Sequence, residues 1–465
     1  MPKTVRPSKK QCSSRVTPAR KLAFSVLEDI RCHKVFLEQA WNRGAKALSL
    51  PPAEKAFARL LATEVVSRRG SLDILINRVL KSPDDIQDDV RNALRISFVE
   101  LFYLNKPAHV VSHEGVELVR SFAPKAAGVA NFALRRACEQ KTEFPFGDIH
   151  SDVSAASLYF GFPQWLTQKL IDEFGFDSAF HFMENSNCSA PLFFIINQAH
   201  ANGPQTLKSL VNQGIKIFPV PRIQQKDCGL SCFLFARRSD VGNEFVIDLL
   251  RKGSLAISDG AAQKVASLAV PDCFPDRFLE IGAGRGTKSL LLQNVALSRF
   301  GKQMALDTLD VDQSRTKERI SRLKQADIVQ NEVFCQDATH LSHFSDATYD
   351  AVFIDAPCTG VGTLRRHADI RWRVTEHEIS AMAEKGLTML KQAARLVKPG
   401  GSLTYATCTL FKEENEQVVE AFLKSEQGNS FSVSSQLLFD DLFHKAQSEP
   451  LFDAHFVCKL QKDVS

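Results

Sequence analysis

Two cysteines and an aspartate follow apolar stretches that are typical of buried strands. The run 351–354 ends at Asp355, and Cys358 comes three residues later. The run 403–407 ends at Cys408. Taken alone, a cysteine is more often a small core residue than a catalyst. A thiolate is nevertheless a strong nucleophile once a nearby cation or helix start lowers its pKa, so these residues are candidates for covalent chemistry.

The positions of these residues predict that they meet. In open α/β sheets, ligands and catalytic groups gather beyond the carboxyl ends of the strands. If the runs 351–354 and 403–407 belong to one such sheet, Asp355, Cys358 and Cys408 share a single site.

A glycine-rich loop at 282–288 is a second candidate, because it follows a predicted strand at 277–281 and opens a predicted helix. Glycine allows a tight turn and lets the backbone approach a ligand closely. The spacing is GxGxG, with glycines at Gly282, Gly284 and Gly286, and not the GxGxxG of pyrophosphate binding. We therefore expect a nucleotide-like ligand that is not a dinucleotide.

Acidic residues follow three further predicted strands and point to the kind of ligand. Asp310 is placed to bind both hydroxyls of a ribose, and Asp337 and Asp355 follow the next two strands. A ligand with a ribose, an amino base edge and a positive centre suits this set, so we predict S-adenosylmethionine in preference to NAD. The expected contacts are Gly282, Ala283, Gly284, Arg285, Gly286, Thr287, Lys288, Asp310, Asp337 and Asp355.

The elements that position these residues alternate between strand and helix from residue 276 onward. Predicted strands lie at 277–281, 304–310, 333–335, 349–354, 402–407 and 455–460, and predicted helices at 287–299, 313–326, 376–397 and 413–424. Repeating βα units imply a doubly wound, Rossmann-like sheet that is mixed but mostly parallel.

The chain before this region has a different pattern. From about residue 16 to 140 apolar residues recur at helical spacing, as at Leu22, Val26 and Ile30, which predicts an all-α domain. Residues 1–21 carry seven basic residues and no acidic one, which is typical of a solvated arm or of a contact with a polyanion. The predicted parts are a basic disordered tail at 1–15, a helical domain at 16–142, a small α+β module at 151–260 and an α/β domain at 261–465.

The composition restricts the class of protein. With 44% hydrophobic and 24% charged residues in 465, the chain has the composition of a soluble globular protein. It has no apolar run of the roughly 18 residues that a membrane helix needs, and its start has no apolar signal-peptide core. The eleven cysteines are scattered without a CxxC pair, which favours neither a disulfide framework nor a zinc site. We expect a reduced, cytoplasmic, monomeric protein without a metal.

Within the helical region, three segments resemble a known RNA-binding family. Leu94–Leu101, Pro107–Leu118 and Asn131–Arg135 are similar to the antitermination factor NusB. The resemblance implies a helical RNA-binding domain. The alternative is a structural bundle that only packs on its neighbour.

The two cysteine segments resemble those of the RNA (cytosine-5)-methyltransferases. Asp355–Cys358 is similar to their motif IV, and Ala406–Cys408, followed by Glu414 and Asn415, to their motif VI. Together with the NusB-like part and the segments 163–166, 259–263 and 365–372, the chain from about 16 to 461 resembles the bacterial 16S ribosomal RNA (cytosine-5)-methyltransferase B group.

This resemblance implies a role for each residue. Cys408 adds to carbon 6 of the cytosine, and Cys358 assists the release of the product. Asp355 stabilises the adduct at the polar edge of the base, and Lys288 joins it. A set of basic residues is expected to bind phosphates, although a solvated charged loop is the alternative: Arg365, Arg366 and Arg371.

The resemblance also implies the partners: S-adenosylmethionine and ribosomal RNA, most specifically 16S, with no membrane. Two alternatives stay open. One is a non-catalytic RNA-binding or antitermination factor with a decayed methyltransferase domain. The other is the same reaction on transfer RNA or 23S ribosomal RNA.

Overall fold

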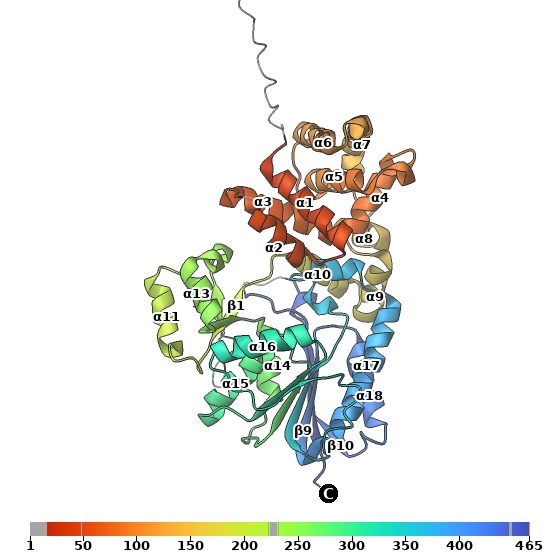
Figure 1. The fold of residues 1–465 in the computed structure, drawn as a ribbon. Coiled ribbons are helices and arrows are strands. Elements are labelled where there is room, and N and C mark those ends of the chain that lie inside the picture. The colour runs from red at the N-terminus through yellow and green to blue at the C-terminus, as the bar shows by residue number, and fades with distance from the viewer. Residues whose placement is uncertain are drawn as a thin grey trace, which may run out of the picture. The chain divides into compact units, whose positions relative to one another are not determined.

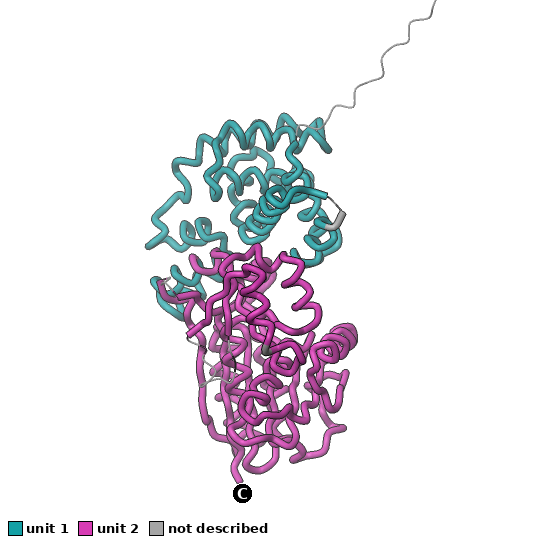
Figure 2. The backbone as a smooth tube through the Cα atoms, turned by 90° about the vertical axis from the view of Figure 1, so that its left-hand side faces the viewer, with its two compact units in different colours: residues 1–183 teal, residues 184–465 magenta. Residues whose placement is uncertain are grey.

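The structure is a computed structural model that describes residues 16–47, 49–221, 223, 230, 232–445 and 449–464. The chain divides into two compact units, Met1–Met183 and Glu184–Ser465 (Figure 2). The predicted boundaries near residues 142 and 260 stay a prediction, and the predicted tail at 1–15 lies outside the described residues.

The described part of the first unit is helical, as predicted (Figure 1). Its α-helices are α1 (Pro18–His33), α2 (Leu37–Ala47), α3 (Pro52–Ser67), α4 (Arg69–Val79), α5 (Asp88–Phe98), α6 (Ala108–Phe122), α7 (Ala127–Gln140), α8 (Val153–Phe160) and α9 (Gln164–Phe174), and α10 (Phe176–Ser186) crosses the boundary in sequence. Leu22 and Val26, which lie one turn apart on α1, are both buried in the core of this unit. The helical spacing of apolar residues in the sequence therefore marks the buried faces.

A buried ion pair and a glycine bring helices of this unit together. Arg20 of α1 binds Glu100 at 2.6 Å, and both side chains are buried. Gly115 of α6 lies against α5, because a Cβ there would come within 2.4 Å of the Ser97 hydroxyl. A larger residue at 115 would push the two helices apart.

The second unit begins with a small sheet in which every described strand pair is antiparallel. Its strands, in the order β2-β3-β1-β4, are β1 (Phe193–Ile196), β2 (Ile217–Pro219), β3 (Cys232–Phe235) and β4 (Leu255–Ile257). Helices α11 (Gly203–Asn212) and α13 (Glu244–Lys252) accompany it.

The large sheet carries the predicted site. Its strand order is β10-β11-β9-β8-β5-β6-β7. The strands are β5 (Phe278–Ile281), β6 (Leu306–Asp310), β7 (Val333–Cys335), β8 (Tyr349–Asp355), β9 (Val397–Thr407), β10 (Phe431–Leu438) and β11 (Phe456–Lys462). The five strands β5 to β9 pair in parallel, and β11 and β10 add an antiparallel edge. The prediction of a mixed, mostly parallel sheet is confirmed.

Helices cover both faces of this sheet (Figure 1). They are α14 (Gly260–Ala269), α15 (Thr287–Phe300), α16 (Gln313–Gln325), α17 (Glu376–Ala394) and α18 (Glu416–Leu423). Apolar residues of α14, α15 and α16 share one core with alternate strand residues such as Phe353. Residues of α17 and α18 share the other core with the intervening residues, such as Ile354. This alternation is the period of two that a strand imposes on its side chains.

Candidate active site

The two thiols lie together beyond the carboxyl ends of adjacent strands. In the parallel pair β8 and β9, Asp355 lies opposite Ala406. Sγ of Cys358 lies 3.4 Å from Sγ of Cys408. The backbone N–H of Cys408 also donates to Sγ of Cys358 at 3.3 Å. The structure thus brings together the two cysteines that the sequence placed at neighbouring strand ends.

The contact between the two sulfurs shifts the pKa values of the two thiols in opposite directions. The hydrogen bond from Cys358 lowers the pKa of Cys408, and it outweighs the burial that opposes it. The same bond, with burial, holds the pKa of Cys358 well above its ordinary value. Lys288 also lowers the pKa of Cys408, whereas Asp355 raises it. These two directions make Cys408 the more acidic thiol of the pair and favour Cys358 as its hydrogen-bond donor.

A lysine and a carboxylate form an ion pair beside the thiols. Lys288 lies in the first turn of α15, and its Nζ is 2.6 Å from Oδ2 of Asp355 at the end of β8. Burial alone would lower the pKa of Lys288, but Asp355 outweighs this effect and raises it. Lys288 therefore keeps its charge at neutral pH.

The glycine-rich loop is fixed to the ends of its neighbouring strands. A Cβ on Gly282, where φ is +81°, would lie 2.3 Å from the backbone oxygen of Asp355. The backbone N–H of Gly284 donates to Oδ2 of Asp310 at 2.7 Å. Only glycine fits the first position, and Asp310 is held at the end of β6 by the second contact.

Other predicted ligand contacts are spread around this loop. Asp337 follows β7, and its carboxylate accepts hydrogen bonds from the backbone and hydroxyl of Thr339, which lower its pKa. Arg285 is exposed and pairs with Glu318 at 2.8 Å. Ala283 is buried, and Gly286 and Thr287 begin α15.

The sequence did not indicate two buried charged residues under the loop. Glu280, at the end of β5, accepts a hydrogen bond from Ser289, and burial raises its pKa to about 7. Arg319 of α16 is fully buried and donates to the backbone oxygen of Gly284 at 2.9 Å. Glu280 had a weak signal, because it directly precedes the loop, but Arg319 lies on a helix whose charges alone predict a solvated face.

The three predicted phosphate contacts have partners inside the protein. Arg365 binds Asp453 at 2.7 Å, with both side chains buried. Arg366 binds Asp453 at 2.6 Å and Asp259 at 2.8 Å. Arg371 is fully buried and donates to Oδ1 of Asn187 at 2.9 Å. These bonds join the segment 365–371 to three distant parts of the second unit, and a role in RNA binding stays a prediction.

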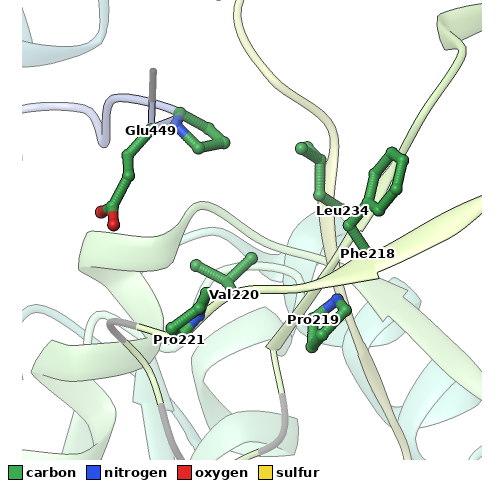
Figure 3. Close-up of a pocket in the computed structure, with 7 residues that line it drawn as sticks. Phe218, Pro219, Val220, Pro221, Leu234 and Glu449 are labelled. Carbon is green, nitrogen blue, oxygen red and sulfur yellow. The ribbon is translucent and has the colours of Figure 1, made fainter. Parts of the chain in front are cut away.

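A cavity of about 220 Å³ lies elsewhere in the second unit (Figure 3). It is lined by Phe218, Pro219, Val220, Pro221, Leu234, Glu449 and Pro450. Apart from the carboxylate of Glu449, the cavity is lined by apolar side chains and backbone. Neither Cys358 nor Cys408 lines it, so this cavity is not the candidate site. Within the described ranges, no helix is both long enough and apolar enough to span a bilayer.

Two family models and curated relatives match parts of the chain. The family described as 16S rRNA methyltransferase RsmB/F matches residues 273–450, and the NusB family matches residues 17–139. The chain is 29% identical over 380 residues to ribosomal RNA small subunit methyltransferase B of Xanthomonas campestris pv. campestris, which is 80% of each chain.

Solved structures share the fold. PH0851 has a TM-score of 0.74 at 20% identity, over 97% of this chain and 100% of its own. NSun6 from Pyrococcus horikoshii, solved with SFG, has a TM-score of 0.51 at 17% identity, over 65% of this chain and 99% of its own. At these identities the likeness shows the fold alone.

Proposed function

We propose that this chain, which matches the RsmB/F methyltransferase family over residues 273–450 and the NusB family over residues 17–139, methylates carbon 5 of a cytosine in 16S ribosomal RNA. The observation that carries this proposal is the pair of thiols 3.4 Å apart beside the Lys288–Asp355 ion pair. We also infer that it acts in the cytoplasm, where ribosomal RNA is made in bacteria.

The methyl donor that suits this site is S-adenosylmethionine. The backbone at Gly284 borders open space, because a Cβ there would meet no protein atom beyond its chain neighbours closer than 3.9 Å, and Asp310 stands at the next strand end, where a carboxylate can take both ribose hydroxyls. The loop Gly282–Lys288 would hold the donor, with Asp310, Asp337 and Asp355 around it. S-adenosylmethionine, when bound, supplies an electron-poor methyl group that carbon 5 of the activated base takes up.

Cys408 activates the base. Carbon 5 of cytosine is too weak a nucleophile to take a methyl group directly. The thiolate of Cys408, which the bond from Cys358 favours, attacks carbon 6 and forms a C6–Sγ bond. The electron pair of the C5=C6 double bond shifts to form C4=C5, and that of C4=N3 moves onto N3, which gives an enamine with a nucleophilic carbon 5. When carbon 5 takes up the methyl group, the pair on N3 re-forms the C4=N3 bond.

Cys358 assists the release. The bond to Cys408 is the main cause that keeps Cys358 protonated, and that cause disappears once Sγ of Cys408 is bound to carbon 6. Cys358 can then lose its proton to solvent and take up the proton of carbon 5. The C6–Sγ bond breaks, its electron pair returns to Cys408 as a thiolate, and the C5=C6 double bond forms again.

Asp355 and Lys288 hold the base in this reaction. Asp355 accepts a hydrogen bond from the polar edge of the cytosine, and Lys288 holds that carboxylate in place at 2.6 Å. Positioned acid–base groups of this kind typically contribute about 10²–10⁴ in rate.

The test is methyl transfer and covalent trapping on RNA. With labelled S-adenosylmethionine, the protein should methylate 16S RNA or small subunits, and bisulfite sequencing should give one cytosine. Cys408→Ser should abolish both turnover and adduct, whereas Cys358→Ala should accumulate a protein–RNA adduct on a denaturing gel.

Other outcomes distinguish the alternatives. Trapping by Cys408→Ser and not by Cys358→Ala would reverse the two roles. Methylation of transfer RNA or 23S RNA alone would change the substrate, and RNA binding without methylation of any RNA would favour the non-catalytic factor.

A further inference from the structure

The buried carboxylate of Glu414 binds the residue that follows each thiol. Its Oε1 accepts the backbone N–H of Thr359 at 2.7 Å, and its Oε2 accepts the Thr359 hydroxyl at 2.6 Å. The same Oε2 accepts the Thr409 hydroxyl at 2.9 Å. Because Thr359 follows Cys358 and Thr409 follows Cys408, one side chain connects both cysteine segments.

Glu414 is itself fixed to strand β9. The hydroxyl of Tyr405 donates to the backbone oxygen of Glu414 at 2.8 Å. The next residue, Asn415, accepts the hydroxyl of Thr407 at 2.6 Å. Both donors belong to β9, so the carboxylate has a defined position relative to the strand that ends at Cys408.

The loop that carries Cys358 depends on this carboxylate. The last sheet bond between the strands runs from the N–H of Ala356 to the oxygen of Ala406 at 2.8 Å, and the next backbone bond joins Gly362 to the oxygen of Cys408 at 3.0 Å. Between them, the described contacts that hold the loop come from Glu414, to which both threonine hydroxyls donate, and from Sγ of Cys358.

The charge of Glu414 also acts on the release step. Burial raises the pKa of Glu414, but its three donors favour the ionised form. After the bond to Cys408 and burial, the Glu414 carboxylate is a further cause that raises the pKa of Cys358. Once Cys358 has lost its proton, a higher pKa makes it a stronger base for the proton of carbon 5.

We propose that Glu414 is a positioning residue that sets the spacing between the Cys358 and Cys408 sulfurs and thereby the rate at which methylated RNA is released. The spacing follows from the contacts alone. The effect on release rests on the proposed function, because it needs the covalent adduct.

The first experiment measures the spacing without RNA or methyl donor. Dibromobimane becomes fluorescent when it joins two neighbouring thiols, and peptide mass spectrometry identifies the Cys358–Cys408 product. Glu414→Gln keeps the size of the side chain but loses its charge and one of the two oxygens that accept the three hydrogen bonds, so it should cross-link on the order of tenfold more slowly. Glu420→Gln, the same change at an exposed residue of α18, should cross-link like the wild type.

A second pair of variants separates positioning from loss of structure. Thr359→Val is nearly isosteric and removes one hydroxyl, whereas Thr359→Ser keeps it. Thr359→Val should behave like Glu414→Gln, and Thr359→Ser should restore wild-type cross-linking. Valine matches the size of threonine and serine keeps its hydroxyl, so this difference reports the hydrogen bond and not the volume of the side chain.

The second experiment measures release on RNA. Glu414→Gln, with Cys358 intact, should accumulate covalent adduct and lower kcat and KM together, on the order of tenfold, because the slowed release step follows adduct formation. Wild-type cross-linking in both Glu414→Gln and Thr359→Val, or lost activity without adduct, would overturn the proposal. If Cys358→Ala also fails to trap RNA, the proposed function fails instead, and the cross-linking result still decides the spacing.

Discussion

The unequal thiols predict a specific change in reactivity when Cys358 is replaced. Its hydrogen bond is the main cause of the lowered pKa of Cys408. Hydrogen bonds to charged groups contribute about 1.5–3 kcal/mol, and a thiol is a weak donor, so about 1.4 kcal/mol is a reasonable value for this one. In Cys358→Ala, about tenfold less Cys408 is then ionised at neutral pH.

The alkylation rate changes by less than the ionised fraction. A thiolate of higher pKa is intrinsically more nucleophilic, with a Brønsted coefficient of about 0.4–0.5. For a tenfold change in ionisation, the rate constant of the thiolate itself therefore rises roughly threefold. We therefore expect iodoacetamide to alkylate Cys408 about threefold more slowly in Cys358→Ala at neutral pH. At alkaline pH, where both proteins are ionised, the variant should react about threefold faster, so the two pH–rate profiles cross.

The assay follows the Cys408 peptide by mass spectrometry over a range of pH. Cys358→Ser keeps a hydroxyl donor and should stay close to the wild-type profile. Exposed Cys273, measured in the same digest, should react equally in all three proteins. Profiles of Cys358→Ala that run parallel to the wild type, or that are faster at neutral pH, would refute the assignment of Cys358 as the donor.

Two further predictions concern the donor site and the arginines. Asp310→Ala should weaken S-adenosylmethionine binding about 10- to 100-fold, because it removes the carboxylate that holds Gly284 and accepts the ribose hydroxyls. Calorimetry without RNA measures this affinity. An unchanged affinity would exclude that role for Asp310. Arg366→Met should lower the free energy of unfolding by about 3–5 kcal/mol in urea, because Asp259 and Asp453 are left buried near each other. A small change in stability with a shallower salt dependence of RNA binding would instead make Arg366 a phosphate contact.

The elements of the large sheet and its helices could be predicted because the sequence patterns that mark them each span only a few neighbouring residues. Buried parallel strands are continuous apolar runs, and each amphipathic helix repeats its apolar face within a few residues. Helix α17 was expected to continue to residue 397 but ends at Ala394, since Val397 already begins β9. Strand β10 was not predicted, because it is an edge strand whose residues from Ser432 to Leu437 are all exposed, so they show no apolar alternation.

The residues of the site that follow strand ends could be predicted from the sequence. The contacts that depend on a partner far away along the chain could not. The meeting of Cys358 and Cys408 follows from two neighbouring parallel strands. By contrast, the basic run at 365–371 has the composition of a surface loop, and its partner Asp453 lies more than eighty residues further along the chain. The three bonds of Glu414 likewise depend on side-chain positions that no spacing in the sequence specifies.

The central claim is that Cys408, and not Cys358, forms the covalent bond to the cytosine. The most direct measurement is mass spectrometry of the trapped Cys358→Ala complex after digestion with nuclease and protease. We predict a Cys408 peptide that carries one methylated cytidine. A nucleotide attached to any other residue, or the absence of a covalent complex when methyl transfer is observed, would contradict the account.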